Sequence, residues 1–415
     1  MRTPAKLGLL ASLYVSQGLP FGFFTQALPV LMRRQGLALE IIGLANLLAL
    51  PWALKFLWAP LVDRYHVPAI GRRRSWILPL QIISILVAAA LAFVDPRAGL
   101  TPMMAALFCT NLLAATQDIA TDGLAVELLE GSERGYGNSV QVAGYRVGMI
   151  LGGGFLLVVF ERLGYAPTYL VMAALLALAT VPIVLHRERP APANVEAAAP
   201  PGIGAWIDAM RRPHMGTWIV VLTVYKGGEA LAYGMVKPLL VDRGFTVEDI
   251  GVLIGTVGFC AGLVGAVLGG VLVSRAGRRR ALVIAGVLQL VGILAYVAPA
   301  AGIGGKQALI AASVIEHVTG GMATVSLFTI MMDICGDAAA TDYTLQASVV
   351  VIATGGAATL SGFVAARIGY AGHFTMSAAF SALGLAFTGH ALARGRIPSA
   401  PVAATEPVVA AAPAP

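Results

Sequence analysis

The chain of 415 residues is 58% hydrophobic and 12% charged, and its mean hydropathy is +0.81. This composition excludes an ordinary soluble globular protein. The net charge of +7 does not indicate a nucleic-acid partner, because most basic residues gather in short loops on one side of the predicted helices, as the positive-inside rule requires.

Apolar stretches long enough to cross the roughly 30 Å hydrocarbon core of a bilayer recur along the whole chain. A stretch of that length with few charges is typical of a transmembrane helix. We therefore expect an all-α membrane protein with twelve transmembrane helices. The predicted helices lie near residues 7–31, 41–62, 75–95, 102–126, 138–160, 165–186, 214–240, 248–273, 281–300, 306–332, 345–366 and 371–392.

Polar side chains and a proline mark the first predicted helix, 7–31. Tyr14, Gln17 and Gln26 are polar groups that hydrocarbon does not solvate, and Pro20 interrupts the backbone hydrogen bonds between them. Such a helix is tolerated where it lines a cavity or packs on a partner helix. We expect these three polar side chains to face a substrate cavity.

The loop after the second predicted helix carries a carboxylate followed by arginines. A carboxylate at this point can accept hydrogen bonds from basic side chains and from the N-terminus of a helix across the seam between two bundles. We interpret Asp63 as a gate latch and Lys55, two turns earlier, as a cavity residue. The arginines also set the membrane topology. The predicted gate in this half consists of Asp63, Arg64, Gly71, Arg72, Arg73 and Arg74.

Two carboxylates lie one helical turn apart in the fourth predicted helix, where unpaired charge is expensive. Asp118 and Asp122 share a face and repel each other, so one of them is expected to carry a proton. Arg146 in the fifth helix is the expected counter-charge of Asp122, which leaves Asp118 as the proton carrier; the same argument allows the two aspartates to exchange roles. The alternative is a buried pair that only locks the two helices together. Gln117 and Tyr145 are expected to line the cavity nearby.

A polar stretch rich in proline and alanine separates two groups of six predicted helices. Residues 187–213 cannot bury a core of their own and are expected to form a cytoplasmic linker. The chain then divides into an N-terminal bundle, 1–186, and a C-terminal bundle, 214–395. The last residues, 396–415, are mostly alanine, proline and valine, which predicts a disordered tail.

The seventh predicted helix carries a stripe of charged and phenolic side chains: Tyr225, Lys226, Glu229 and Tyr233. At about 100° per residue, Lys226 and Tyr233 lie close together around the helix, with Glu229 to one side. Ammonium and phenol groups together suit an anionic or aromatic solute. We expect the stripe to line the cavity. The alternative is snorkelling to the membrane surface, above all for Lys237 at the outer end of the helix and less so for the deeper Lys226.

The eighth predicted helix combines a glycine stripe with a second basic loop. Glycines at three- and four-residue spacings form a groove in which another helix packs closely, either as static packing or as a sliding surface. In the loop, Ser274 stands where Asp63 stands in the first half, so this latch is expected to be weaker. The glycines are Gly251, Gly255, Gly258, Gly262, Gly265 and Gly269, and the predicted gate residues are Arg275, Gly277 and Arg278.

Glu316 and His317 are titratable residues of the tenth predicted helix. As sequence neighbours they point about 100° apart, so we expect no pair between them. Glu316 is a further candidate for proton coupling. His317 is expected to line the substrate cavity, and between its two other roles a hydrogen-bonded core histidine is commoner than a proton carrier.

The two groups of predicted helices align with each other. The matched residues are Tyr14 and Tyr225, Pro29 and Pro238, Gly36 and Gly244, and Gly43 and Gly251. Parallel repetition of six helices predicts two pseudo-symmetric bundles, the architecture of major facilitator transporters. Because the basic loops mark the cytoplasmic side, both termini are expected there.

Five strings are long or rarely matched: KFLWAPLVDRY at 55–65, GRRRSW at 71–76, QDI at 117–119 with Asp122, ERG at 133–135 and GYRVG at 144–148. They resemble the AmpG-type permeases of the major facilitator superfamily, a group with muropeptide permeases, siderophore importers and acetyl-CoA transporters. The opening QGLPFGFFTQALP at 17–29 looks more like the siderophore importers. Muropeptide permeases of this kind are often longer, whereas this chain has room for twelve helices. The resemblance implies proton-coupled import across a bacterial inner membrane.

The intramembrane charges and the resemblance together predict a secondary active transporter. We expect proton-coupled uptake of a bulky amphiphilic or anionic solute such as a siderophore by alternating access, with a muropeptide permease as the alternative. A membrane-embedded transferase would need a nucleophile with its base, or metal ligands, and the sequence shows neither. The expected partners are a small solute, protons and lipid. No cofactor, metal or nucleic acid is expected, and the chain is expected to act as a monomer.

Overall fold

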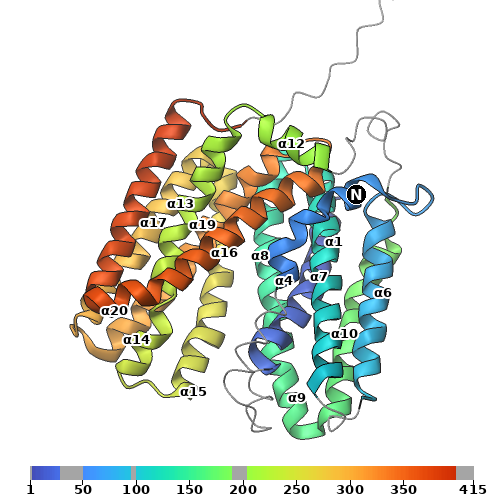
Figure 1. The fold of residues 1–415 in the computed structure, drawn as a ribbon, viewed down its shortest axis with the longest axis horizontal. Coiled ribbons are helices and arrows are strands. Elements are labelled where there is room, and N and C mark those ends of the chain that lie inside the picture. Colours follow the sequence, from blue (N-terminus) through green and yellow to red (C-terminus); the bar gives the residue numbers. More distant parts are fainter. Residues whose placement is uncertain (1, 29–49, 95–99, 189–202, 399–415) are drawn as a thin grey trace, which may run out of the picture.

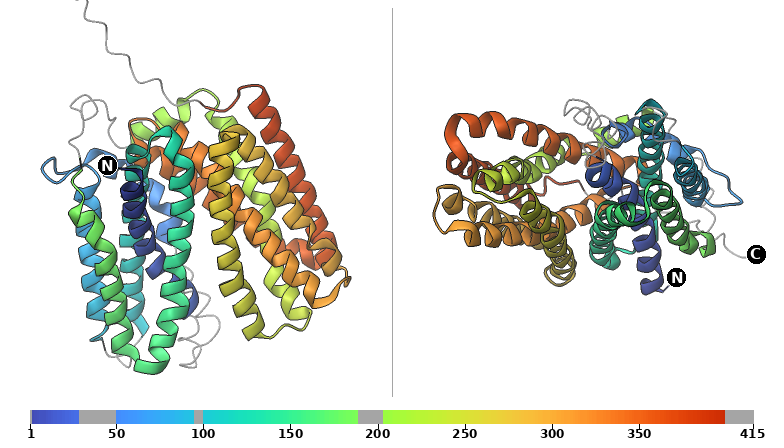
Figure 2. Two further views of the ribbon diagram at one scale, coloured as in Figure 1. Left: turned by 180° about the vertical axis from the view of Figure 1, so that it is seen from behind. Right: turned by 90° about the horizontal axis from the view of Figure 1, so that it is seen from below.

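The computed structural model describes residues 2–28, 50–94, 100–188 and 203–398. These residues form two helical bundles that lie side by side (Figures 1 and 2). The bundles lie close together at the end that carries the N-terminus and the helix α12 (Ile203–Arg211), and they stand further apart at the opposite end (Figure 1). The first end also carries both arginine-rich loops, and we call it the basic end.

The N-terminal bundle is built from helices that are broken at several points. Two short π-helical segments interrupt the first and fifth membrane helices, and a 3-10 turn interrupts the second. Its elements are α1 (Thr3–Gly22), η1 (Phe23–Ala27), α4 (Leu50–Leu54), η3 (Lys55–Leu57), α5 (Ala59–Arg64), α6 (Arg74–Leu91), α7 (Leu100–Leu128), η4 (Gly131–Glu133), α8 (Arg134–Ile150), η5 (Leu151–Phe155), α9 (Leu156–Leu163) and α10 (Tyr165–Leu185).

The C-terminal bundle follows α12 and repeats this plan. Its last element is a pair of helices that meet at Gly369, whose φ of +71° ends the first and starts the second. The elements are α13 (Met215–Tyr233), α14 (Val236–Asp242), α15 (Val247–Ile250), η6 (Gly251–Val257), α16 (Gly258–Ala276), α17 (Arg278–Leu294), α18 (Val297–Ala300), α19 (Gly305–Ile334) and α20 (Ala339–Ala393).

The prediction of an all-α membrane protein with twelve membrane helices is confirmed. Within the described residues, nine helices are long and apolar enough to span a bilayer, and α20 counts once among them although it holds two helices. The helix α7 has the required length but carries three carboxylates, and the broken segment from α4 to α5 continues the second predicted helix. These elements complete the twelve.

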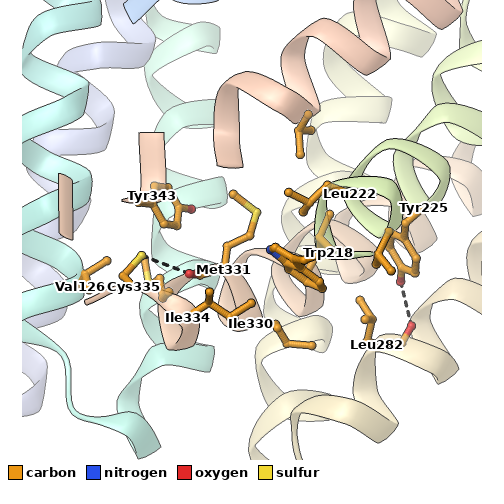
Figure 3. Packing of buried hydrophobic residues seen from close by; sticks show 14 of the residues in the cluster. Val126, Trp218, Leu222, Tyr225, Leu282, Ile330, Met331, Ile334, Cys335 and Tyr343 are labelled. Atoms are coloured by element: carbon orange, nitrogen blue, oxygen red, sulfur yellow. Dashed lines mark hydrogen bonds between the residues drawn. The ribbon is translucent and has the colours of Figure 1, made fainter. Parts of the chain in front are cut away.

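Buried apolar side chains form separate cores within each bundle and one shared core near the basic end. In the shared core, Trp218 and Met331 of the C-terminal bundle lie in one cluster with Val126 of the N-terminal bundle (Figure 3). The indole nitrogen of Trp218 donates a hydrogen bond of 2.7 Å to Gln346 Oε1, which satisfies the one polar atom of this buried ring. The shared core therefore joins the two bundles at the basic end.

Glycines determine which helices approach each other most closely. A Cβ atom on Gly148 of α8 would overlap the backbone of Val15 in α1, and one on Gly265 of α16 would overlap the backbone of Val318 in α19. The predicted groove on the eighth helix therefore receives the tenth helix. The close contact does not extend along the whole predicted glycine stripe, because a Cβ atom added at Gly251 would have no neighbour within 4 Å. Close backbone approach of this kind is the usual way in which membrane helices associate.

The described part of the predicted linker, 187–213, contains structure that its composition did not suggest. The helix α12 occupies Ile203–Arg211, and its Trp206 ring lies 5.5 Å from the ring of Phe56. The linker is thus attached to the N-terminal bundle by an aromatic contact. Residues 189–202 and most of the predicted tail, 399–415, lie outside the described residues, as do Pro29, Gly36 and Gly43 of the predicted repeat.

Candidate transport site

A cavity of about 560 Å³ lies between the two bundles and is lined by side chains from both. Seven of its lining residues are charged or titratable in the usual pH range, which is a high proportion for a site enclosed by membrane helices. They are Lys55, Asp118, Asp122 and Arg146 from the N-terminal bundle, and Glu229, Glu316 and His317 from the C-terminal bundle. The cavity therefore collects most of the predicted site residues.

Lys55 is the cation beside Asp118 and Asp122, two of the carboxylates of α7. Its ammonium forms an ion pair with Asp118, and it lies 3.9 Å from Asp122 Oδ2. Asp122 Oδ1 accepts hydrogen bonds of 3.0 Å from Tyr14 Oη and from Gln141 Nε2. This arrangement corrects the predicted pairing of Asp122 with an arginine. The 3-10 turn at Lys55 interrupts the second helix and directs its side chain toward α7.

Arg146 takes a different position from the one predicted. Its guanidinium lies 5.7 Å from the Phe259 ring of α16, and a Cβ atom on Gly262 would overlap it. Within the part of the chain that the structure describes, Arg146 has no ion-pair or hydrogen-bond partner. The side chain of an N-terminal-bundle residue thus lies on the surface of the C-terminal bundle.

The carboxylate of Glu229 is held inside the C-terminal bundle. Lys226, one turn earlier on α13, forms an ion pair with it, and Gln289 Nε2 donates a hydrogen bond to the same oxygen. Lys226 Nζ also donates to Thr324 Oγ1 at 3.1 Å. Glu229 and Tyr233 reach the cavity, as predicted, whereas Lys226 lies behind them as the partner of Glu229.

Glu316 and His317 lie closer together than their spacing predicted. Glu316 Oε2 is 3.0 Å from His317 Nδ1, which also lies 2.8 Å from the carbonyl oxygen of Ser313. The flexible side chain of Glu316 bridges the angle of about 100° between neighbouring helical positions. The prediction that the two residues do not pair is therefore wrong. The His317 ring contacts Tyr233 edge-to-face, with centroids 5.8 Å apart.

An aromatic wall lies beside Lys55 on the N-terminal side of the cavity. The rings of Phe21, Trp52 and Tyr145 are in mutual contact, with centroids 5.4 to 6.1 Å apart. Trp52 and Tyr145 line the cavity, and the ammonium of Lys55 lies 5.7 Å from the Trp52 ring centroid. Tyr145 was predicted here, whereas Trp52 was not. A tryptophan three residues before an intramembrane lysine was the signal available in the sequence.

Three polar residues predicted to line the cavity lie inside the N-terminal bundle instead. Gln117 Nε2 donates a 3.0 Å hydrogen bond to Ser16 Oγ. Gln26 packs against Gly153, where it fills the space left by the missing side chain. Gln17 is completely buried. These glutamines reflect packing between α1 and its neighbours, which is the alternative explanation for polar residues in a broken helix.

Tyr225 is also a packing residue, because its hydroxyl donates a 2.8 Å hydrogen bond to the carbonyl oxygen of Leu282 in α17 (Figure 3). Its repeat partner Tyr14 does reach the cavity, so the two halves use the same residue differently. The prediction missed Gln141 and Tyr343, which line the cavity and are joined by a hydrogen bond of 3.2 Å. This bond links a residue of α8 to one of α20 across the seam.

Asp63 links the two bundles at the basic end. Its Oδ2 accepts hydrogen bonds from the backbone nitrogen and the hydroxyl of Thr341 at 2.7 and 2.6 Å, in the first turn of α20. Its Oδ1 accepts from Arg73 Nη2 at 2.6 Å and lies 3.3 Å from Arg72 Nη2. Asp63 is buried. A carboxylate in this position satisfies free backbone donors and lies at the positive end of a helix dipole.

The environment of Asp63 keeps it ionised. Burial by itself raises the pKa of its carboxyl group, but the charges of Arg73 and Arg72 and the hydrogen bonds from Thr341 outweigh burial and hold the pKa below its ordinary value. The latch is therefore charged throughout the physiological pH range.

The other predicted gate residues of this loop divide into those that cross the seam and those that do not. Arg72 crosses it and donates a 3.2 Å hydrogen bond to the carbonyl oxygen of Asp337. Arg74 stays within the N-terminal bundle and donates to the Val184 carbonyl at 2.7 Å. Gly71 has a φ of +114°, which turns the loop. Arg64 is exposed.

A second, weaker seam contact lies where the repeat places it. Arg278 forms an ion pair with Asp333 of α19 and donates a 2.5 Å hydrogen bond to the carbonyl oxygen of Gly131. Arg134 of α8 lies 2.8 Å from the same aspartate. The hydroxyl of Ser274 donates to Tyr136 Oη at 3.1 Å, a neutral contact where the first half has Asp63.

The two remaining predicted gate residues of this half have local roles. Arg275 is exposed, and Gly277 has a φ of +76° that ends α16 and begins α17. The sequence prediction missed the partners across the seam, Thr341 for Asp63 and Gly131 for Arg278, because nothing in a single loop indicates which helix lies opposite.

Comparison with known proteins identifies the family. The sequence profile of the Major Facilitator Superfamily matches residues 10–342. The chain belongs to the Major Facilitator Superfamily. It is 30% identical over 384 residues to the anhydromuropeptide permease of Escherichia coli K12, which covers 91% of this chain and 78% of that protein. It is 25% identical over 346 residues to a putative transporter AmpG 4 of Rickettsia felis, covering 80% of this chain and 84% of that protein.

Solved structures of this superfamily have the same fold. The Major Facilitator transporter FucP, in its outward conformation, superposes with a TM-score of 0.70 at 14% identity, over 95% of this chain and 99% of that one. The human organic anion transporter MFSD10 superposes with a TM-score of 0.68 at 15% identity, over 94% and 100%. At these identities the likeness concerns the fold alone.

These comparisons establish a multi-pass membrane transporter of the AmpG-like group, not an enzyme. They also alter the balance between the two predicted cargoes. The E. coli relative is described as an anhydromuropeptide permease, which favours the alternative prediction over siderophore uptake. The similarity of the opening string to siderophore importers covers one helix, whereas this relative covers 91% of the chain.

Proposed function

We propose that this transporter imports an anhydromuropeptide across the bacterial inner membrane, driven by protons and by alternating access. The observation that supports it most is a single cavity, lined by both bundles, that combines an aromatic wall with a network of charges. A muropeptide joins a polar sugar ring to a peptide with carboxylates, so it needs both kinds of surface. We take the basic end as cytoplasmic and the working unit as one chain.

Alternating access is supported by the distribution of contacts across the seam. Asp63 with Thr341, Arg72 with Asp337 and Arg278 with Gly131 all lie at the basic end. The structure is thus closed at that end. Because carrying a solute through requires the seam to open there, these bonds must break in each cycle.

Proton coupling is supported by an imbalance of charge. Two carboxylates, Asp118 and Asp122, share the single ammonium of Lys55, so one added proton makes the group neutral. Asp118 is bound directly by Lys55. Both neutral donors near Asp122 bind its Oδ1, which leaves Oδ2 free to hold the proton. We therefore assign the proton to Asp122 in this conformation, in place of Asp118 as the sequence suggested.

The proton site and the solute site are adjacent, which allows one to influence the other. The ammonium of Lys55 lies 5.7 Å from the Trp52 ring centroid. A sugar or acyl group that packs on Trp52 would change the surroundings of the Lys55 ammonium. It would thereby change how strongly this ammonium interacts with Asp118 and with Asp122. Solute binding then favours one protonation state of the pair over the other, and proton uptake favours solute binding by the same amount.

Uptake into energised membrane vesicles tests the proposed cargo. Vesicles containing the transporter should accumulate labelled anhydromuropeptide, and unlabelled anhydromuropeptide should compete with it. A labelled ferric siderophore is the comparison, because the opening string resembles importers of that class. Accumulation of the siderophore without the muropeptide would overturn the assignment.

A further inference from the structure

Every carboxylate that lines the cavity lies beside a cationic or titratable side chain, whereas one arginine has no direct partner among the described residues. Lys55 is the cationic neighbour of Asp118 and Asp122, and Lys226 is the cationic neighbour of Glu229. Glu316 lies beside His317. Each carboxylate in the cavity therefore has a cationic or titratable neighbour within 4 Å. Arg146 is not part of any of these groups.

Arg146 lines the cavity with a guanidinium that has no carboxylate partner in the described part of the chain. An arginine does not lose its charge under physiological conditions, and a charge without a direct partner between membrane helices is costly. Glu316 and Glu229 act on Arg146 electrostatically but form no ion pair with it. The Phe259 ring at 5.7 Å provides a cation–π contact, which is weaker than an ion pair. The five donors of the guanidinium remain available to a bound anion.

The helix opposite leaves room for Arg146 by means of a glycine. An added Cβ at Gly262 would overlap the guanidinium, so any other residue there would force the arginine side chain to shift from its place on α16. Gly255, two turns earlier on the same glycine stripe, has no atom within 4 Å of an added Cβ. The close approach of Arg146 is therefore a specific property of position 262.

We propose that Arg146 is the anchor for a carboxylate of the transported solute. A guanidinium matches a carboxylate with two parallel hydrogen bonds, which gives both affinity and orientation. The aromatic wall at Trp52 and Tyr145 then receives the less polar part of the solute. This inference rests on the proposed function for the identity of the solute, but not for the chemistry of the subsite.

The position of Arg146 also ties solute binding to the movement of the bundles. The residue belongs to α8 of the N-terminal bundle, and its surroundings at Phe259 and Gly262 belong to α16 of the C-terminal bundle. A carboxylate bound to Arg146 therefore lies at the seam and contacts groups from both bundles. Binding at such a place favours the conformation in which the two bundles enclose the solute.

Equilibrium binding to the purified full-length transporter tests the anchor. The probes are an anhydromuropeptide with free carboxylates and the same compound with its carboxylates converted to amides. The wild-type protein should bind the carboxylate form about 10- to 100-fold more tightly, as expected for a charge-assisted hydrogen bond. Arg146→Gln should remove this preference, and Arg146→Lys should restore part of it. A preference that persists in Arg146→Gln overturns the proposal.

Gly262→Ala moves the guanidinium without changing its charge, and Gly255→Ala is the matched control on the same stripe. The first should reduce the carboxylate preference, while the second should leave it unchanged. If Arg146 only stabilises the fold, Gly262→Ala and Arg146→Gln will lower thermal stability and leave the preference intact. That result contradicts the proposal.

A second probe pair separates this inference from the proposed function. N-benzoylglycine and its amide carry an aromatic ring with and without a carboxylate, and neither is a muropeptide. If the protein does not bind muropeptide but prefers N-benzoylglycine over its amide in an Arg146-dependent manner, the cargo is wrong and the anchor stands. If it binds muropeptide and neither pair shows an Arg146-dependent preference, the anchor is wrong and the cargo stands. If the protein does not bind muropeptide and shows no Arg146-dependent preference for either carboxylate probe, the proposed cargo and the proposed anchor are both wrong.

Discussion

Asp63 and Ser274 occupy equivalent positions in the two bundles and show how much one side chain changes the seam. The carboxylate of Asp63 accepts two hydrogen bonds from Thr341 and is paired with arginines. The hydroxyl of Ser274 makes one neutral contact to Tyr136. A buried charged network is worth more than a hydroxyl pair, and it costs more when one member is removed.

Asp63→Asn should leave the amount of folded protein near normal and reduce uptake by at least about tenfold. Removing the charge takes one of two carboxylate partners from Arg72 and Arg73, which keep only the less buried Glu127, and it weakens the bonds to Thr341 that hold the basic end closed. Uptake per molecule of purified protein measures the effect. Ser274→Ala is the matched control and should retain most of the activity. An Asp63→Asn protein as active as the wild type would rule out the latch.

The pH dependence of the latch follows from the lowered pKa of Asp63. For a carboxylate whose pKa is lower in the folded protein, the stabilisation is complete above the ordinary pKa and is lost only when the pH falls through the lowered value. The basic end should therefore stay equally closed between about pH 5 and pH 8. Spin labels on α5 and α20 of the Asp122→Asn protein, which cannot bind the coupling proton at that position, would report this as an unchanged distance distribution, and a shift within that range would contradict the assignment.

At the scale of helices, the glycines that were visible in the sequence determine the interfaces. Gly148 and Gly152 of the fifth membrane helix lie on α1, and Gly265 and Gly269 of α16 lie on α19. The interface between α1 and α8 belongs to the N-terminal bundle alone. It is therefore expected to stay intact while the bundles move relative to each other.

Gly148→Ala should destabilise the N-terminal bundle, because the added Cβ would overlap the Val15 backbone. Overpacking of this kind costs about 1–3 kcal/mol. Gly154→Ala is the control, since no atom lies within 4 Å of its added Cβ. The melting temperature in detergent should fall for the first variant and stay equal or rise for the second. Equal melting temperatures for both variants would show that the interface tolerates a methyl group.

The sequence was sufficient to predict helices, glycine grooves and the latch residue, because each depends on local composition or on a repeat within the chain. It was not sufficient for the partner of Asp122. The choice between Lys55 and Arg146 depends on the 3-10 turn in the second helix and on which face of α8 meets α16. Those features arise from packing between bundles, which a single sequence does not encode in any spacing. The helix α12 was missed because its surroundings are rich in proline and alanine.

At the scale of the whole molecule, the two bundles are related by repetition but are not equivalent. Both have an arginine at the basic loop that crosses the seam, Arg72 in one and Arg278 in the other. The N-terminal bundle contributes the lysine–carboxylate group and the aromatic wall, and the C-terminal bundle contributes Glu229, Glu316 and His317. The two bundles thus have similar arginine contacts at the basic end but contribute different charged side chains to the cavity.

The orientation of the transporter can be tested with single cysteines in a background without Cys109, Cys260 and Cys335. We expect the basic end to face the cytoplasm because it carries both arginine-rich loops. Asp208→Cys in α12 should be protected from an impermeant thiol reagent in intact cells, whereas Ala301→Cys at the opposite end should react. The reverse pattern would invert the topology.

The central claim, a proton-driven carrier of anhydromuropeptide, is tested most directly in liposomes that contain only the purified protein. With an inward proton gradient, labelled anhydromuropeptide should accumulate above its external concentration, and a protonophore should abolish this. Asp122→Asn should lose accumulation and retain exchange of labelled for unlabelled solute, because exchange needs no net proton movement. Accumulation that persists with the protonophore, or in both Asp118→Asn and Asp122→Asn, would contradict the account.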